Sequence, residues 1–380
     1  MDFIEKEVAS SPDLADKYGK LGELYSRKLW HQLTEKLLEM ILEDGTIQGD
    51  KLVPLYEEFI TKFEAKLNQL QFARIIVGIT RKISDPDTRI SLMEKILEKR
   101  ARLGADAALL LEMETTLLRI QKGEVAEVRD TLEQGKETLD GLLAAETIVH
   151  ASVYRAASEY HKAAGPPEEY YKNALMQLAY TPVDSKDMSS EEKAALAVNI
   201  TLAALTGDGV YNFGEVLATP ILSALEGTPE SWLGDLLKAF HEGNVDAFAM
   251  CVGANQASFD AQPALASRKD FVRQKMSLLS LMNMVFERPS HDRNIRFQEI
   301  ADRTKIPFDQ VELLVMRAMS LGLIRGIMDG VEQVLSVSWV QPRVLDKPQL
   351  KHLCDRLGEW KENVHSTLTF VEDQTPELFN

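Results

Sequence analysis

The sequence predicts a mainly α-helical protein in which helical repeats are followed by a small α/β subdomain and one last long helix. Apolar residues recur every three or four positions through most of the chain, which is the period of an amphipathic helix. Alternation typical of strands is nearly absent before Ile295. Together with short glycine breaks between the helical runs, this favours a solenoid of paired antiparallel helices over residues 14–250. Residues 1–13 are expected to form a flexible N-terminus.

Recurring breaks indicate the length of the helical unit. The runs QKGEV at residues 121–125 and HEGNV at residues 241–245 share one form, in which a helix ends, a glycine and a polar residue follow, and a new helix begins. Gly165 marks another helix end. The distance from Gly123 to Gly165, and half that from Gly165 to Gly243, is roughly 40 residues, the length of a two-helix solenoid repeat.

Local capping signals predict where two of these helices begin. Asp85 precedes Pro86, which pairs an N-cap residue with a proline at the first helical position. Ser189 and Glu192 have the spacing of a capping box, in which each side chain bonds the other residue's backbone N–H. A helix is expected directly after each signal.

Residues 268–345 show a different order of elements. The expected pieces are a helix ending at Arg288, an extended segment at 295–297, helices at 299–304 and between Pro307 and Gly322, and strands at 323–328 and 331–339. The buried stripe of the longer helix would contain Val311, Leu314, Val315, Ala318 and Leu321. Between the strands, Asp329-Gly330 favours a type I′ turn with positive φ at both positions. This order is typical of a winged helix.

Winged helices often bind DNA, but the charges here argue against it. Outward positions of the longer helix are expected to be Asp309, Gln310, Glu312, Arg317 and Ser320. The hairpin tip carries Asp329 and Glu332 and lacks lysine and arginine. Phosphate binding needs clustered Lys and Arg, because counterion release supplies much of its free energy. A winged-helix nucleic-acid binder is therefore kept only as the alternative from a different class.

Four segments in colinear order resemble one known family. They are LYSRKLWHQLTEKLL at 24–38, GDGVYNFGEVLATPIL at 207–222, FERPSHDRNIRFQEIADRTKIPFDQVELLVMRAMSLGLIRG at 286–326, and VSWVQPRVLD at 337–346. This pattern is similar to that of the 26S proteasome non-ATPase regulatory subunit 13 family, whose members end in a PCI domain. The resemblance implies that residues 165–250 are the helical part of that PCI domain and that residues 268–345 are its winged helix.

The resemblance also implies a function. It predicts a non-catalytic scaffold subunit of the regulatory-particle lid, which supports ubiquitin-dependent protein degradation. The implied partners are neighbouring PCI subunits of the lid and a bundle of C-terminal helices, near the lid's deubiquitinating pair and a ubiquitin receptor. Within the same class, a PCI subunit of the signalosome or of translation initiation factor three stays an alternative, against which the segments at 207–222 and 339–346 argue.

The last helix, expected over residues 346–372 and followed by a tail at 373–380, carries apolar residues at spacings of three or four, with Thr367 at the one weak position and Leu368 beside it. We call these residues the apolar seam: Leu350, Leu353, Leu357, Trp360, Val364, Leu368 and Val371. Such a seam is typical of a helix in a coiled coil or bundle. It either folds back on its own solenoid or joins helices of other chains, and the resemblance favours the second interpretation.

A second interface is expected at the hairpin of the winged helix. In its second strand Leu335, Val337 and Trp339 alternate with polar or smaller residues, so one face is apolar. We expect the edge formed by Val334, Leu335, Val337 and Trp339 to be exposed and to meet the next subunit by strand addition.

No motif for chemistry accompanies these features. Glycine-rich phosphate loops and nucleophile motifs are absent, and no two of the seven histidines lie within ten residues of each other. His150 and His161 share a helix face, but structural zinc needs four close ligands. We therefore expect no enzyme activity, cofactor or metal site.

Composition indicates the compartment and limits the partners. The net charge is −16, and most of the acidic excess lies before residue 268, which disfavours nucleic acid and anionic membranes as partners. Two cysteines fit a reducing compartment, the N-terminus lacks the apolar core of a signal peptide, and no apolar run is long enough to span a membrane. The expected location is the cytoplasm and nucleus.

Overall fold

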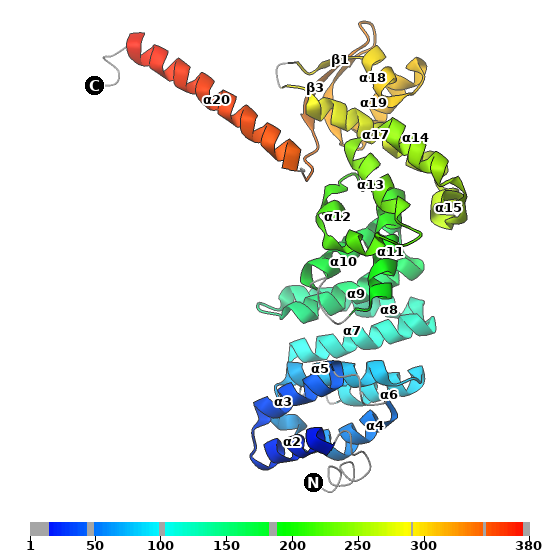
Figure 1. The fold of residues 1–380 in the computed structure, drawn as a ribbon, viewed down its shortest axis with the longest axis vertical. Helices are drawn as coiled ribbons and strands as arrows, with labels where there is room; N and C mark the ends of the chain where they lie inside the picture. The colour runs from blue at the N-terminus through cyan, green and yellow to red at the C-terminus, as the bar shows by residue number, and fades with distance from the viewer. Residues whose placement is uncertain are drawn as a thin grey trace. The chain divides into compact units, whose positions relative to one another are not determined.

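The computed structural model describes residues 15–43, 49–98, 103–181, 188–289, 292–344 and 347–374 (Figure 1). The chain divides into two compact units, Met1–Asp208 and Gly209–Asn380. The division falls within the expected solenoid, because the segment after Asp208 packs inside the second unit. There Asn212 Oδ1 accepts a hydrogen bond from the Val344 N–H at 3.2 Å, and the Phe213 ring lies edge-on to Phe240.

The first unit is built from paired helices. Its elements are α2 (Ala15–Ser26), α3 (Trp30–Leu38), a π-helical turn at Glu39–Glu43, α4 (Gly49–Pro54), short π and 3₁₀ turns at Leu55–Phe59, Ile60–Lys62 and Glu64–Lys66, α5 (Gln69–Lys82), α6 (Pro86–Leu97), α7 (Ala105–Lys122), α8 (Val125–Gly141), α9 (Thr147–Ala164), α10 (Pro167–Tyr180) and α11 (Ser190–Thr206). Helices α5, α7 and α9 contact one another in turn, and α6, α8 and α10 pack beside them (Figure 1). This is the arrangement of an α-solenoid.

The predicted capping signals are confirmed. The Asp85 carboxylate accepts the Thr88 N–H at 3.0 Å with Pro86 at the start of α6, and Ser189 and Glu192 complete both bonds of the capping box. Gly123, at the end of α7, adopts the left-handed conformation that glycine tolerates best.

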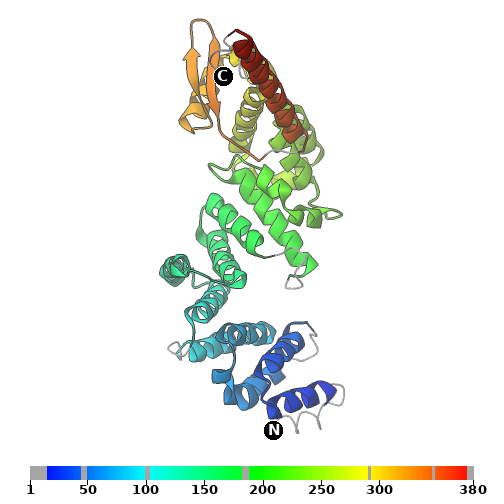
Figure 2. The same ribbon diagram turned by 90° about the vertical axis from the view of Figure 1, so that its left-hand side faces the viewer.

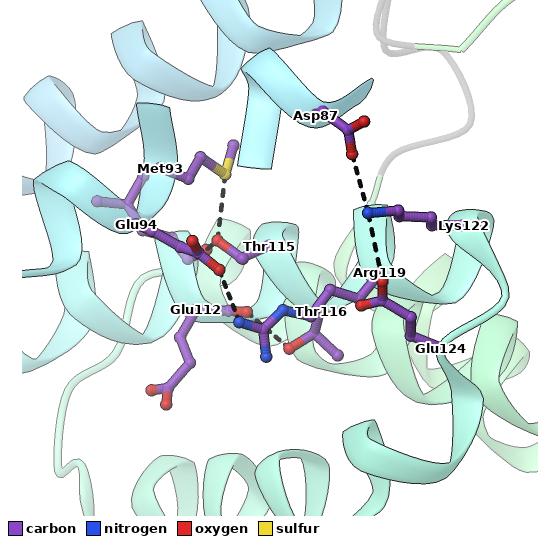
Figure 3. Close-up of polar contacts among 10 residues, drawn as sticks. Asp87, Met93, Glu94, Glu112, Thr115, Thr116, Arg119, Lys122 and Glu124 are labelled. Carbon is purple, nitrogen blue, oxygen red and sulfur yellow. Dashed lines mark hydrogen bonds and ion pairs between the residues drawn. The ribbon is translucent and has the colours of Figure 1, made fainter. Parts of the chain in front are cut away.

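Polar contacts fix how α6 lies on α7 (Figure 3). Arg119 Nη2 lies 2.7 Å from Glu94 Oε1, and the Thr115 hydroxyl donates to Met93 Sδ at 3.3 Å. At the end of α7, Lys122 Nζ lies 2.9 Å from Asp87 Oδ1, and that carboxylate raises the pKa of Lys122.

The second unit contains the α/β subdomain. Its elements are α12 (Gly214–Ala218), a 3₁₀ segment at Pro220–Leu225, α13 (Trp232–Glu242), α14 (Val245–Ala254), α15 (Gln256–Ala261), α16 (Pro263–Ser267), α17 (Lys269–Glu287), β1 (Asn294–Arg296), α18 (Phe297–Thr304), a 3₁₀ turn at Phe308–Gln310, α19 (Val311–Ser320), β2 (Ile324–Asp329), β3 (Val334–Val340) and α20 (Lys347–Gln374). The order from α17 to β3 confirms a winged helix. Figure 2 shows β2 and β3 as a long orange hairpin.

The three strands form one antiparallel sheet in the order β1-β3-β2. Ile295 of β1 lies opposite Leu335 of β3, and both side chains are fully buried. Arg325 of β2 lies opposite Trp339, and a bulge between Arg325 and Gly326 shifts the register. The apolar face predicted for β3 therefore forms part of the winged-helix core.

Two local expectations about the winged helix are wrong. The hairpin has a longer loop over residues 330–333, in which positive φ falls on Gln333 and not on the Asp329-Gly330 pair. The Asp329 carboxylate stabilises this loop by accepting the N–H groups of Val331 and Glu332 at 2.8 and 3.0 Å. Leu321, expected in the buried stripe, is exposed because α19 ends at Ser320.

One lysine is buried in the second unit. Lys275 of α17 is 1% exposed, and its ammonium lies over three aromatic rings. The distances from Nζ to the ring centroids are 5.5 Å for Tyr211, 5.3 Å for Phe213 and 5.8 Å for Phe271. Cation–π attraction of this kind compensates part of the lost hydration and ties α17 to the segment before α12.

Candidate interaction surfaces

Helix α20 presents the whole apolar seam to solvent. The seven side chains are between 39% and 66% exposed, and they are Leu350, Leu353, Leu357, Trp360, Val364, Leu368 and Val371. Trp360, Val364, Leu368 and Val371 also line a shallow depression along this face. A row of apolar side chains this long is unusual on the surface of a monomer, and it is a candidate interaction site.

The segment that leads into α20 is anchored. The Arg343 guanidinium donates to the Asn283 side-chain oxygen and, at 3.3 Å, to the His241 carbonyl, and it lies 5.1 Å from the Phe286 ring centroid. The Val344 N–H is held by Asn212. Residues 341–344 are thus fixed to the end of α13 and to α17.

Gly243 makes this anchor possible. Its φ of +63° ends α13 in the left-handed conformation. A Cβ atom at this position would lie 2.4 Å from Asn283 Nδ2, which instead donates to the His241 carbonyl at 3.0 Å. The glycine predicted as a simple helix break therefore also clears space for the side chain that binds Arg343.

The exposed edge expected on β3 is absent, and that prediction is wrong. β3 is the inner strand, because β1 pairs with Val334–Ser336 on one side and β2 pairs along the other. Leu335 and Val337 are buried at 0% and 5% exposure, while Val334 and Trp339 are half-buried. The apolar alternation of this strand serves the core.

The open edge belongs to β2. Among the described residues β2 pairs only with β3, and Ile327 on β2 is 77% exposed. The outward positions predicted for α19 are exposed as expected, but Leu313 and Met316 are exposed beside them. Both residues lie opposite the buried stripe, at positions that the helical spacing alone indicates.

His150 and His161, the pair considered for metal binding, pack against aromatic side chains. The His150 ring stacks on Tyr180 with centroids 4.6 Å apart, and burial lowers the pKa of His161. In the described part of the chain, no group of His, Cys, Asp and Glu side chains is placed to hold a metal ion. None of the helices described has the length and apolarity needed to cross a membrane.

Comparison with protein families assigns both parts of the chain. The family described as PSD13 N-terminal repeats matches residues 17–237, and the PCI domain family matches residues 252–339. A partial match, at 27% identity over 58% of this chain, is the Eukaryotic translation initiation factor 3 subunit M of Aspergillus terreus, of which it covers 47%.

Similarity over the full length is much stronger. The chain is 39% identical to the 26S proteasome non-ATPase regulatory subunit 13 homolog B of Arabidopsis thaliana, with 100% of this chain and 98% of the relative aligned. It is 35% identical to the 26S proteasome non-ATPase regulatory subunit 13 of Dictyostelium discoideum, with the same coverage. With its helical repeats, its winged helix and this full-length similarity, the chain belongs to the 26S proteasome non-ATPase regulatory subunit 13 family.

Proposed function

We propose that this protein is a non-catalytic scaffold subunit of the lid of the 26S proteasome regulatory particle, and that it supports ubiquitin-dependent degradation by holding other lid subunits together. The exposed apolar seam of α20 is the observation that carries the proposal. Full-length similarity to proteins named as non-ATPase regulatory subunits supports it. The partial similarity to a translation-factor subunit covers too little of either chain to favour that alternative.

Burial of the seam among helices of other lid subunits would supply the association energy. Burying one large apolar side chain stabilises by about 1.5–3 kcal/mol, so seven half-exposed side chains contribute roughly 5–10 kcal/mol. That is comparable with the free-energy cost of association, roughly 4–15 kcal/mol, which comes from lost translational and rotational freedom. The seam therefore needs help from a second contact, and the winged helix offers one.

The winged helix would meet a neighbouring PCI subunit through the open edge of β2 and the outer face of α19. The edge offers unpaired backbone groups for strand addition, and Ile327, Leu313 and Met316 offer apolar area. Contacts with the deubiquitinating pair and a ubiquitin receptor stay predictions from the family resemblance. We further propose a cytoplasmic and nuclear location, in keeping with two free cysteines.

Replacement of two central seam residues tests the role of α20. In cells that carry only the variant, Leu357→Ala with Trp360→Ala should lower incorporation into purified proteasome lids by about tenfold or more, because central interface residues contribute about 2 kcal/mol each. Mass spectrometry of affinity-purified lids measures the ratio of this chain to the other subunits.

Glu359→Ala with Glu362→Ala is the matched control, because both glutamates lie on the opposite face of α20. This control should be incorporated normally. Normal incorporation of the seam variant would refute the role of α20. Recovery of the unchanged chain with a different PCI complex would refute the assignment to the lid.

A further inference from the structure

A groove lined by several charged side chains lies in the first unit, between helices of the solenoid. Its walls come from α5, α7, α9, α10 and α11, and it encloses about 350 Å³. The charged residues that line it are Arg74, Arg81, Glu114, Arg155, Glu159, Lys162 and Glu192. Solenoids commonly use such concave surfaces for binding.

Two arginines of the groove share one carboxylate, and a third arginine lines the groove beside them. Arg81 Nη2 lies 2.7 Å from Glu114 Oε1, and Arg155 Nη1 lies 3.9 Å from the same oxygen. Glu114 is largely buried, with a side chain 10% exposed, whereas the arginine side chains are 42% and 40% exposed. Arg74 lies two turns before Arg81 on the same face of α5. Together the three arginines and Glu114 therefore carry excess positive charge in a chain whose net charge is −16.

Two hydrogen-bond donors in the groove are unsatisfied among the described residues. Arg74 Nε is buried without a hydrogen-bond partner there, while its Nη1 donates to Gln71. The Tyr170 hydroxyl is also buried without a partner, and the Tyr170 side chain is only 4% exposed. Burial raises the pKa of Tyr170, so its hydroxyl keeps its proton and stays a donor. Buried donors of this kind are stabilised by a ligand that brings acceptors.

The other two carboxylates that line the groove are already engaged. Glu159 lies 3.9 Å from Lys162 Nζ, and Glu192 accepts the Ser189 N–H in the capping box. The three arginines, which have only Glu114 among them, therefore keep uncompensated positive charge. Arginine is well suited to that role, because its planar guanidinium binds a carboxylate through two parallel hydrogen bonds.

We propose that this groove binds an extended peptide segment of a partner protein, whose acidic side chains pair with Arg74, Arg81 and Arg155. Charge complementarity selects this occupant. A nucleic acid would need a continuous basic track, and the carboxylates of Glu114, Glu159 and Glu192 in the same lining interrupt one. The groove and α20 belong to different units, so this binding is distinct from assembly through the seam.

Fluorescence anisotropy with the full chain tests the proposal. The probe is a short labelled peptide of alternating glutamate and serine, and the same peptide with glutamine in place of glutamate is its control. The glutamate peptide should bind more tightly, and added salt should weaken it. Arg74→Gln should weaken it about tenfold, the effect of losing one charged hydrogen bond.

Arg129→Gln is the matched control variant, because Arg129 lies on α8 outside the groove and pairs with Glu133. It should bind the glutamate peptide as the unchanged chain does. Tyr170→Phe removes only the unpaired hydroxyl, so it should keep the melting temperature of the unchanged chain while it binds the peptide more weakly.

Three outcomes would overturn the proposal. One is equal binding of the glutamate and glutamine peptides, or binding of neither. Another is an affinity for the glutamate peptide that Arg74→Gln leaves unchanged. The third is tighter binding of a labelled single-stranded oligonucleotide than of the glutamate peptide, which would favour a nucleic acid as occupant.

Discussion

Strand β3 and helix α20 show the same kind of sequence pattern and have opposite surroundings. In both, apolar residues recur at the period of their own secondary structure, and both were expected to form interfaces. The structure buries Leu335 and Val337 of β3 inside the winged helix, whereas Leu357 and Trp360 of α20 are 56% and 66% exposed. The pattern thus predicts which face is apolar and leaves open what covers it.

Whether an apolar face is buried depends on elements that are distant in sequence. β3 is covered because the short strand β1, about forty residues earlier, takes the position beside it in the sheet. In the described residues, α20 has no comparable neighbour. A buried apolar residue stabilises the chain itself, and an exposed one stabilises only a complex. Mutations in β3 should therefore lower the stability of the isolated chain, whereas mutations in α20 should weaken its association with other chains.

The largest difference is expected from leucine-to-alanine substitutions. Leu335→Ala should lower the free energy of opening of residues 334–340 by about 2–5 kcal/mol, because it leaves a cavity in a closely packed core. Leu357→Ala should change the stability of the isolated chain by no more than about 0.5 kcal/mol, since that side chain is exposed. Hydrogen–deuterium exchange of the isolated full chain measures both values. Equal losses in the two variants would contradict the comparison.

An intermediate effect is expected at the segment that joins the two regions. Arg343→Gln removes charged hydrogen bonds to Asn283 and to the His241 carbonyl, and should lower the local stability of residues 341–344 by about 1.5–3 kcal/mol. The same exchange experiment measures it.

Arg317→Gln is the control for that measurement, because Arg317 donates to Gln274 in an exposed contact on α19. We expect a change of no more than about 0.5 kcal/mol there. If both variants changed exchange at 341–344 to the same small extent, the anchor at Arg343 would be ruled out.

The smallest effect is expected at the hairpin tip, where Asp329 is fully exposed. The N–H groups of Glu332 and Val331 hold the pKa of Asp329 below its ordinary value of 3.8. A lowered folded-state pKa means that the stabilisation is complete above 3.8 and is lost as the pH falls through the folded value. An acid titration followed by NMR of the two amides should therefore show a midpoint below 3.8, and Asp329→Asn should remove it. A midpoint at or above 3.8 would disprove the side-chain bonding.

Features set by neighbouring residues could be predicted from the sequence. Asp85 with Pro86, and Ser189 with Glu192, specify helix starts because both partners of each hydrogen bond lie within one turn. The same holds for the seam on α20, which needs only the helical period. The prediction of a type I′ turn at Asp329-Gly330 is wrong for a local reason too. The Asp329 side chain stabilises a longer loop than the dipeptide alone favours.

Features that depend on distant residues could not be predicted. Arg81, Glu114 and Arg155 come from three helices and belong to no motif, so only the stacking of α5, α7 and α9 brings them together. The anchor of Arg343 on Asn283 and His241 likewise joins positions 60 and 102 residues apart. Single-sequence patterns carry no signal for such contacts.

The aromatic surroundings of Lys275 have a consequence for covalent modification. Reagents and enzymes that acylate or conjugate lysine need an accessible, neutral amine, and here the ammonium is buried against three rings. Such chemistry can reach this nitrogen only after α17 separates from the segment before α12. A modified Lys275 would therefore record that the second unit had opened, whereas modification of the chain's surface lysines carries no such information.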